Sequence, residues 1–166
     1  LIIGQNHSHT RAGFPHQTSG SCWILLGNGD GTFEVSTSLK TGIDLHGDIR
    51  AIALGDMNQD NRLDVIITQN EEDTRLFLNQ SNMPKSIKVS IEGPPDNLQG
   101  FGVHCRLVLA NGTVGPLHEI TAGSGWLSQN EPTCLLFSPS KPMKLFVRWP
   151  GGSTQNYMLS DGQQNI

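Results

Sequence analysis

The feature that most constrains the fold of this chain is an alternation of apolar and polar side chains with a period of two residues. After Lys85, for example, Ile87, Val89 and Ile91 fall on one face and polar residues stand between them. Helical periodicity is almost absent, and 19 Gly and 9 Pro supply many tight turns. The sequence therefore predicts an all-β chain of many short strands.

The first half of the chain contains two degenerate copies of one pattern. Each copy has an apolar run that ends in Gln-Asn, then a loop, then a second apolar run that closes on Asn. The first runs start at Leu1 and Val65, and the second runs start at Trp23 and Thr74. Residues 48–55 carry small or apolar side chains on both faces, as an inner strand of a propeller blade does. This repeat predicts a partial β-propeller of about one and a half blades.

The second half of the chain changes character from residue 83 onward. Its strands alternate cleanly, which suits a sheet with one solvent-facing side. We therefore predict propeller-type blades over residues 1–82 and a small β-sandwich-like domain over residues 83–166. Strands are expected at residues 1–4, 22–26, 32–36, 48–55, 63–68 and 75–78, from residue 85 onward, and at residues 103–110, 114–120, 133–137, 144–149 and 156–159.

Charge and hydropathy exclude several classes of function. The net charge is −4 and there is no basic stripe, so nucleic acid is not an expected partner. No apolar run approaches the roughly 18 residues that a membrane-spanning helix needs, so membrane insertion is not expected. The chain starts inside a strand-like stretch without an initiator Met, and we expect it to be part of a longer parent chain.

The three cysteines, Cys22, Cys105 and Cys134, show no C-x-x-C spacing. A zinc site built on cysteine is therefore not expected, and at most one disulfide can form within the chain. Cys105 and Cys134 lie in apolar strand-like runs, so we expect them to pack as buried thiols.

The sharpest chemical signal is the nine-residue segment from Asp56 to Asp64, which has oxygen-bearing side chains at positions 1, 3, 5 and 9. A tightly coiled loop turns alternate side chains inward, and Ca²⁺ takes about six to eight oxygen ligands. Asn61 at position 6 is expected to adopt a positive φ, and Arg62 at position 7 offers its backbone carbonyl. The predicted calcium ligands are Asp56, Asn58, Asp60, Arg62 and Asp64.

Two other structures come into question for this loop, an EF-hand and a metal-free hairpin turn. An EF-hand is not expected, because position 12 is Ile67 rather than Glu and the flanking segments look like strands. A metal-free hairpin turn rich in Asp and Asn is the open alternative. Three carboxylates this close repel one another without a cation, which favours calcium.

The loop and an earlier turn resemble FG-GAP/VCBS repeats. The matching phrases are Leu54-Gly55-Asp56-Met57-Asn58-Gln59-Asp60 with Leu63-Asp64-Val65-Ile66, and Leu26-Gly27-Asn28-Gly29-Asp30-Gly31-Thr32-Phe33. Such repeats form blades of calcium-binding β-propellers, including the head of integrin α-subunits. The resemblance implies a cation loop between the innermost strand and the next one, with the five ligands named above. Asn61 departs from the family, which usually has Gly there.

The second half resembles the ASPIC/UnbV domain, which follows such repeats in secreted bacterial proteins and in cartilage acidic protein-like proteins. The matching phrases are Gly100-Phe101-Gly102-Val103, Ile120-Thr121-Ala122-Gly123-Ser124-Gly125-Trp126-Leu127-Ser128-Gln129 and Val147-Arg148-Trp149-Pro150-Gly151-Gly152. Leu136-Phe137-Ser138-Pro139 departs from the family, which usually carries a Phe-Gly-Leu-Gly-like turn. Together the two resemblances imply an extracellular or cell-surface location, which in a bacterium means the periplasm or the outer surface.

These observations predict a calcium-binding, non-catalytic recognition or adhesion module that binds an unidentified protein or glycan. The main alternative is an all-β hydrolase of glycans or phosphoesters that uses calcium with His46, His104 or His118, and two converging acids in one cleft would favour it. A purely structural calcium-stiffened module is a third possibility. We expect Trp126 and Trp149 to be core or interface aromatics, with a sugar-stacking surface as the alternative.

Overall fold

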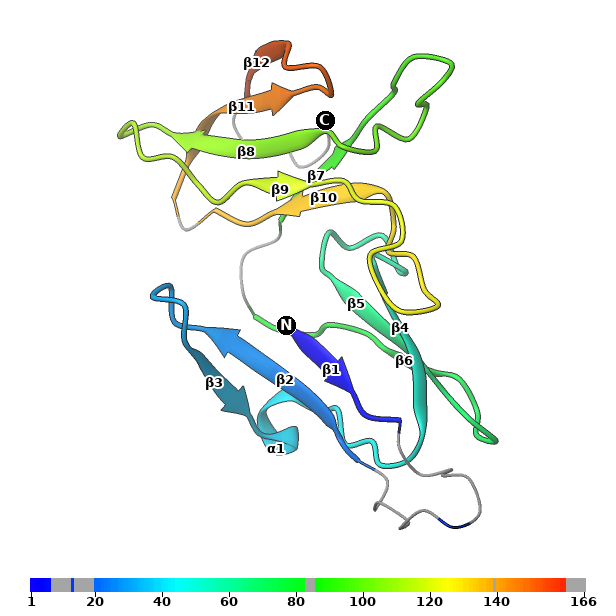
Figure 1. Cartoon of the computed structure of the whole chain (residues 1–166). Coiled ribbons are helices and arrows are strands. Elements are labelled where there is room, and N and C mark those ends of the chain that lie inside the picture. The colour runs from blue at the N-terminus through cyan, green and yellow to red at the C-terminus, as the bar shows by residue number, and fades with distance from the viewer. Residues whose placement is uncertain (7–12, 14–19, 83–85, 139, 161–166) are drawn as a thin grey trace. The chain divides into compact units, whose positions relative to one another are not determined.

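The computed structural model describes residues 1–6, 13, 20–82, 86–138 and 140–160, and these residues are nearly all β (Figure 1). Their strands form several small antiparallel sheets, and none of the sheets in the described ranges closes on itself. This confirms the predicted all-β class and is consistent with a partial propeller followed by a sandwich-like domain. The strands are β1 (Ile2–Gly4), β2 (Cys22–Gly27), β3 (Phe33–Ser36), β4 (Ile49–Gly55), β5 (Asp64–Gln69), β6 (Arg75–Phe77), β7 (Ile87–Ser90), β8 (His104–Leu109), β9 (His118–Glu119), β10 (Thr133–Leu136), β11 (Pro142–Arg148) and β12 (Thr154–Met158).

Contacts within the chain divide it into two compact units that interleave in sequence. The first unit contains the described residues of Leu1–Ala53, Val65–Phe77 and Gly125–Ser128. The second contains those of Leu54–Asp64, Leu78–Ser124 and Gln129–Ile166, so the whole of the Asp-rich loop belongs to it. The domain boundary between residues 82 and 83 rests on the change in sequence pattern and stays a prediction.

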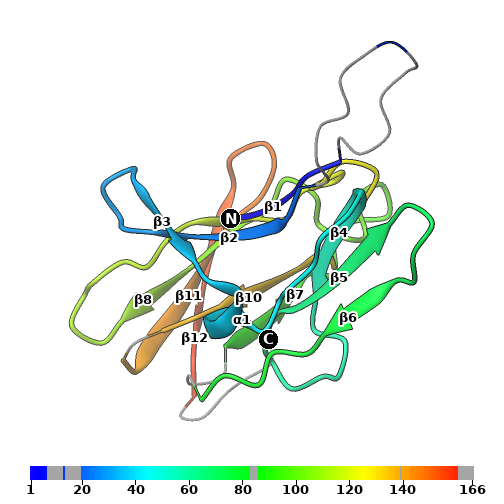
Figure 2. The same cartoon turned by 90° about the horizontal axis from the view of Figure 1, so that it is seen from below.

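The propeller-like strands form two three-stranded meanders, β1-β2-β3 and β4-β5-β6. Figure 2 shows β4, β5 and β6 side by side, and β5 pairs antiparallel with β6. The β2–β3 hairpin forms at the predicted Asn-Gly-Asp-Gly turn, where Gly29 and Gly31 have φ of 85° and 90°. Asp30 fixes the turn because one carboxylate oxygen accepts both the N–H and the hydroxyl of Thr32. Local turn chemistry therefore sets the register of this hairpin.

A short helix, α1 (Ser38–Thr41), follows β3 and was not predicted. It ends because Gly42 adopts a left-handed φ of 71° and donates its N–H to the Ser38 carbonyl. Four residues are too few to show a helical period, which explains why the sequence pattern misses it. Nowhere in the described ranges does a helix combine the length and the apolar character that a membrane crossing requires.

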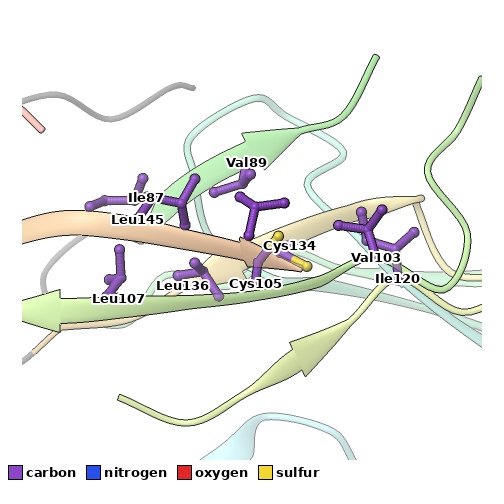
Figure 3. Close-up of a cluster of buried hydrophobic side chains, with 10 residues drawn as sticks. Ile87, Val89, Val103, Cys105, Leu107, Ile120, Cys134, Leu136 and Leu145 are labelled. Atoms are coloured by element: carbon purple, nitrogen blue, oxygen red, sulfur yellow. The ribbon is translucent and has the colours of Figure 1, made fainter. Parts of the chain in front are cut away.

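The second unit has a sandwich-like core between a four-stranded sheet, β12-β11-β8-β9, and a two-stranded sheet, β10-β7. Side chains of both sheets meet in one buried cluster (Figure 3). Burial of one aliphatic side chain is worth about 1.5–3 kcal/mol, whereas an exposed ion pair contributes about 0–1 kcal/mol. The cluster therefore dominates the stability of this unit. Its members are Ile87, Val89, Val103, Cys105, Leu107, Ile120, Cys134, Leu136, Leu145 and Val147.

The predicted strand over residues 114–120 is only partly correct. The Asn111-Gly112 turn forms as expected, with the Leu109 N–H donated to the Thr113 carbonyl. Beyond it, Val114 makes one isolated bridge to Val108, and within residues 114–120 only the two residues of β9 form a ladder with β8. Pro116 explains the gap, because proline has no N–H to donate to the ladder.

Candidate metal-binding loop

The Asp-rich loop connects β4 to β5. Asp56 follows the last residue of β4, and Asp64 is the first residue of β5. Both are buried, with exposed fractions of 7% for Asp56 and 0% for Asp64. A buried carboxylate is costly unless hydrogen bonds compensate for the lost water, so the partners of these two side chains decide what the loop can do.

The loop coils around the carboxylate of Asp56. One carboxylate oxygen accepts the N–H of Asp60 at 2.9 Å, and the other accepts the N–H of Asn61 at 3.1 Å. Asn61 has a φ of 62°, which confirms the positive φ predicted for position 6. Gln59 also has a positive φ, 59°, and this second left-handed residue was not predicted. In this coil the successive backbone N–H groups of Asp60 and Asn61 both point toward the carboxylate of Asp56.

Asp64 ties the end of the loop to its beginning and to the segment after β6. Its carboxylate accepts the N–H of Met57 at 2.9 Å and the N–H of Asn79 at 2.8 Å. Asn79 in turn donates its side-chain N–H to the Leu63 carbonyl at 3.3 Å. Sequence reasoning did not name Asn79 as a site residue. Its signal was present, since the second copy of the repeat closes on this Asn.

Asn58 and Asp60 lie between these two anchors. Asn58 accepts the N–H of Asp60 at 3.2 Å, and Asp60 accepts the N–H of Arg62 at 2.9 Å. The Arg62 guanidinium lies 3.0 Å from the other carboxylate oxygen of Asp60. Partial burial acts to raise the pKa of Asp60, but the hydrogen bonds from Arg62 and the charge of Arg62 outweigh it, so this pKa lies below its ordinary value. Asp60 is thus held as an anion.

Lys88 on β7, in the same unit as the loop, supplies a second positive charge. Lys88 Nζ lies 3.6 Å from a carboxylate oxygen of Asp56 and 2.7 Å from Glu131. Glu131 also accepts the N–H of Asp56 at 2.9 Å. Burial acts to lower the pKa of Lys88, but Glu131 and Asp56 more than offset this effect and raise it. Lys88 and Arg62 therefore relieve the carboxylate repulsion that the sequence argument assigned to a metal ion.

The described residues contain no group of three or more His, Cys, Asp and Glu side chains arranged to hold a metal ion. Asp56, Asp60 and Asp64 are therefore not gathered as three; each accepts backbone N–H groups instead. These hydrogen bonds are also what the metal-free alternative requires. The calcium ligands Asp56, Asn58, Asp60, Arg62 and Asp64 stay a prediction.

The donor chemistry of the loop nevertheless fits calcium. The predicted donors are carboxylate, amide and carbonyl oxygens, which a hard cation prefers. A carboxylate oxygen that accepts one N–H retains further lone-pair capacity. A calcium ion would compete with Lys88 for Asp56 and with Arg62 for Asp60. Its binding therefore depends on whether it displaces two ion pairs.

A cavity of about 210 Å³ lies beside the loop within the second unit, lined by Leu54, Gly55, Leu63, Ser86, His118, Glu119, Asn130, Glu131, Thr133, Cys134 and Leu135. Of the three candidate histidines of the hydrolase alternative, His118 alone lines it. His104 pairs with Glu119 at 3.6 Å, and His46 pairs with Asp44 at 3.3 Å in the first unit. Burial lowers the pKa of His118, which keeps it neutral near pH 7.

The two candidate tryptophans differ in their surroundings. Trp149 packs against the core cluster and donates its ring N–H to Gln155, as expected for a core aromatic. Trp126 is 76% exposed, so a core position is wrong for this residue. It lies in the turn Gly125–Ser128 beside Leu127, which is equally exposed and therefore does not cover it.

A comparison with protein families supports the resemblance to FG-GAP-type repeats in the first half of the chain. Residues 14–67 match the family described as the FG-GAP-like repeat, and the match includes β4 and the Asp-rich loop. No curated protein matches the chain. The likeness of the second half to ASPIC/UnbV domains stays a prediction. Over residues 14–67 the chain is similar to the FG-GAP-like repeat, a repeat typical of extracellular proteins.

Proposed function

We propose that this chain is a calcium-binding, non-catalytic recognition or adhesion module of an extracellular protein. The observation that carries the proposal is the coil of the loop around the buried carboxylate of Asp56. This coil forms an acidic centre at the junction of β4 and β5. A calcium ion would supply positive charge there and hold two strand ends in register, so its role would be structural.

The first test compares melting temperatures in calcium and in EDTA. At a calcium concentration 100-fold above the dissociation constant, the melting temperature should rise by about 5–10 °C. Asp60→Ala should lose this rise, because it removes both oxygens at position 5. Asp73→Ala, which removes an exposed acid outside the loop, should keep it. No rise in the parent chain, or a rise that survives Asp60→Ala, contradicts calcium binding by the loop.

Recognition is supported by the exposed turn around Trp126. Trp126 and Leu127 are both 76% exposed, and Leu127 has a φ of 52°, which is strained for a leucine. The Ser128 hydroxyl donates to the Ile52 carbonyl and holds the turn on β4 within the first unit. An aromatic side chain held out from a fixed turn suits contact with a sugar face or with an apolar patch on a protein.

A glycan array separates recognition from a purely structural role. The parent chain should bind at least one class of glycan on the array, and Trp126→Ala should weaken that binding at least tenfold. Trp23→Ala is the control, because Trp23 is also exposed but lies on β2. If the parent chain binds no glycan, glycan recognition is contradicted, and a protein partner or a purely structural role explains the module instead.

One observation favours the hydrolase alternative. Glu119 and Glu131 both line the cavity that contains His118, so two acids border one cleft. Each carboxylate already has a partner, since Glu119 pairs with His104 and Glu131 binds Lys88 and the Asp56 N–H. A panel of glycoside and phosphoester substrates tests this alternative. Turnover that Glu119→Gln abolishes would replace the non-catalytic proposal.

A further inference from the structure

The two buried cysteines of the second unit face each other across its core. Cys105 is on β8 and Cys134 is on β10, strands of two different sheets. Their exposed fractions are 0% and 4%. Figure 3 shows the two sulfur atoms adjacent, and the proximity of Cys134 raises the pKa of the Cys105 thiol. Their neighbours in the strands are Val147 and Val89, so both thiols lie among aliphatic side chains.

We propose that Cys105 and Cys134 form a disulfide bond that links the two sheets of the second unit. Both are thiols in the structure, and so is Cys22. Cys22 lies on β2 in the first unit, whereas the other two occupy one core cluster. The sequence allows at most one internal disulfide, and this arrangement selects one of the three possible pairs. The proposal does not rest on calcium binding.

The redox step is an ordinary thiol–disulfide exchange. A disulfide oxidant, such as oxidised glutathione or a protein disulfide, is attacked by one cysteine thiolate and forms a mixed disulfide. The second cysteine then displaces the oxidant, and the S–S bond forms. The two cysteines together lose two protons and two electrons, and the oxidant leaves as two thiols. An extracellular environment supplies such oxidants.

The local environment indicates when this bond would form. The contact with Cys134 and burial raise the pKa of the Cys105 thiol, whereas the contact with Cys105 lowers the pKa of Cys134, so Cys134 is the thiol of the pair that ionises first. Both sulfurs are nevertheless out of reach of an oxidant in solution, because both residues are buried. Exchange is therefore expected during folding, before the two sheets close over the thiols.

The test is to refold the reduced, denatured chain in a mixture of reduced and oxidised glutathione. Remaining thiols are then alkylated under denaturing conditions, and the digested peptides are identified by mass spectrometry. We expect one linked peptide pair that contains Cys105 and Cys134, with Cys22 alkylated. Cys22→Ser should give the same linked pair. Alkylation of Cys105 and Cys134 in most molecules, or comparable amounts of pairs with Cys22, would overturn the proposal.

A second measurement needs no variant. The refolded chain is melted with and without a thiol reductant. Because the bond would close a loop of 28 intervening residues, counted from Cys105 to Cys134, its loss should lower the melting temperature by about 5–10 °C. An unchanged melting temperature contradicts a disulfide that holds the two sheets together.

Discussion

The ammonium group of Lys88 lies 2.7 Å from one carboxylate oxygen of Glu131, and the other oxygen of that carboxylate accepts the N–H of Asp56. Lys88 is on β7, and Glu131 stands just before β10, so the two paired strands of the small sheet hold the start of the Asp-rich loop. The loop is therefore anchored to the second unit through its first residue.

Substitution of Glu131 should reveal how strongly this anchor holds the loop. Glu131→Ala removes the acceptor of the Asp56 N–H and the partner of Lys88, and should lower the free energy of unfolding by about 1–3 kcal/mol. Glu131→Gln should cost less, because its amide oxygen can still accept the N–H. Urea unfolding in EDTA measures both. Equal effects of the two substitutions would show that the hydrogen bond to Asp56 contributes little.

Removal of the positive side chains should strengthen calcium binding. Lys88→Gln and Arg62→Gln each free a carboxylate from a competing cation, and Arg62→Gln leaves the predicted backbone ligand in place. We expect the dissociation constant to fall by about threefold to tenfold in each case, since partly exposed ion pairs are worth about 1 kcal/mol. Calcium titration of the variants measures it, with Arg75→Gln on β6 as the control.

Weaker calcium binding in both Lys88→Gln and Arg62→Gln would contradict this competition. The two side chains would then support the folded loop more than they oppose the metal ion. Melting of the same variants in EDTA distinguishes the two effects, because loss of loop support lowers the melting temperature without any calcium present.

Position 61 tests the coil itself. Asn61 has a φ of 62°, a region that alanine reaches only with strain. Asn61→Ala should therefore destabilise the chain by about 1 kcal/mol, whereas Asn61→Gly should be close to neutral. Chemical denaturation in EDTA compares the two variants. If Asn61→Gly is as costly as Asn61→Ala, the side chain of Asn61, rather than its backbone conformation, stabilises the loop.

The structure confirms what short-range patterns encode. β4 and β5 lie on either side of the loop, as their apolar runs predicted, and Asn61 has the positive φ expected from its position. Both features depend on neighbouring residues, so the local sequence is sufficient to predict them. The hairpin at Asn28–Gly31 was predictable for the same reason.

Contacts between distant segments were not predictable from the sequence. Asp56 and Glu131 are 75 residues apart, and nothing near either residue indicates that they meet. The same holds for Lys88 and for the approach of Cys105 to Cys134 across the core. Such contacts depend on how two sheets pack, which an alternating pattern leaves open. For the same reason, the neutralisation of the loop carboxylates was assigned to calcium from the sequence, and the contribution of Lys88 was not predicted.

Acid should destabilise the chain through His118. Burial lowers the pKa of His118 below its ordinary value of 6.5 in the folded state. The unfolded chain therefore takes up a proton near pH 6.5 that the folded chain does not, and stability falls as the pH drops from 6.5 toward the folded pKa. His118→Gln should show a smaller loss of melting temperature between pH 7.5 and pH 5.5. An equal loss in both proteins would assign the pH dependence to other groups.

Isothermal titration calorimetry with calcium tests the central claim most directly. We expect the parent chain to bind one calcium ion per molecule, Asp60→Ala to show no binding, and Asp73→Ala to bind as the parent does. No heat of binding in the parent chain, together with an unchanged melting temperature, would contradict a calcium loop. The hydrogen bonds of Asp56 and Asp64 would then hold the loop between β4 and β5 without a metal ion.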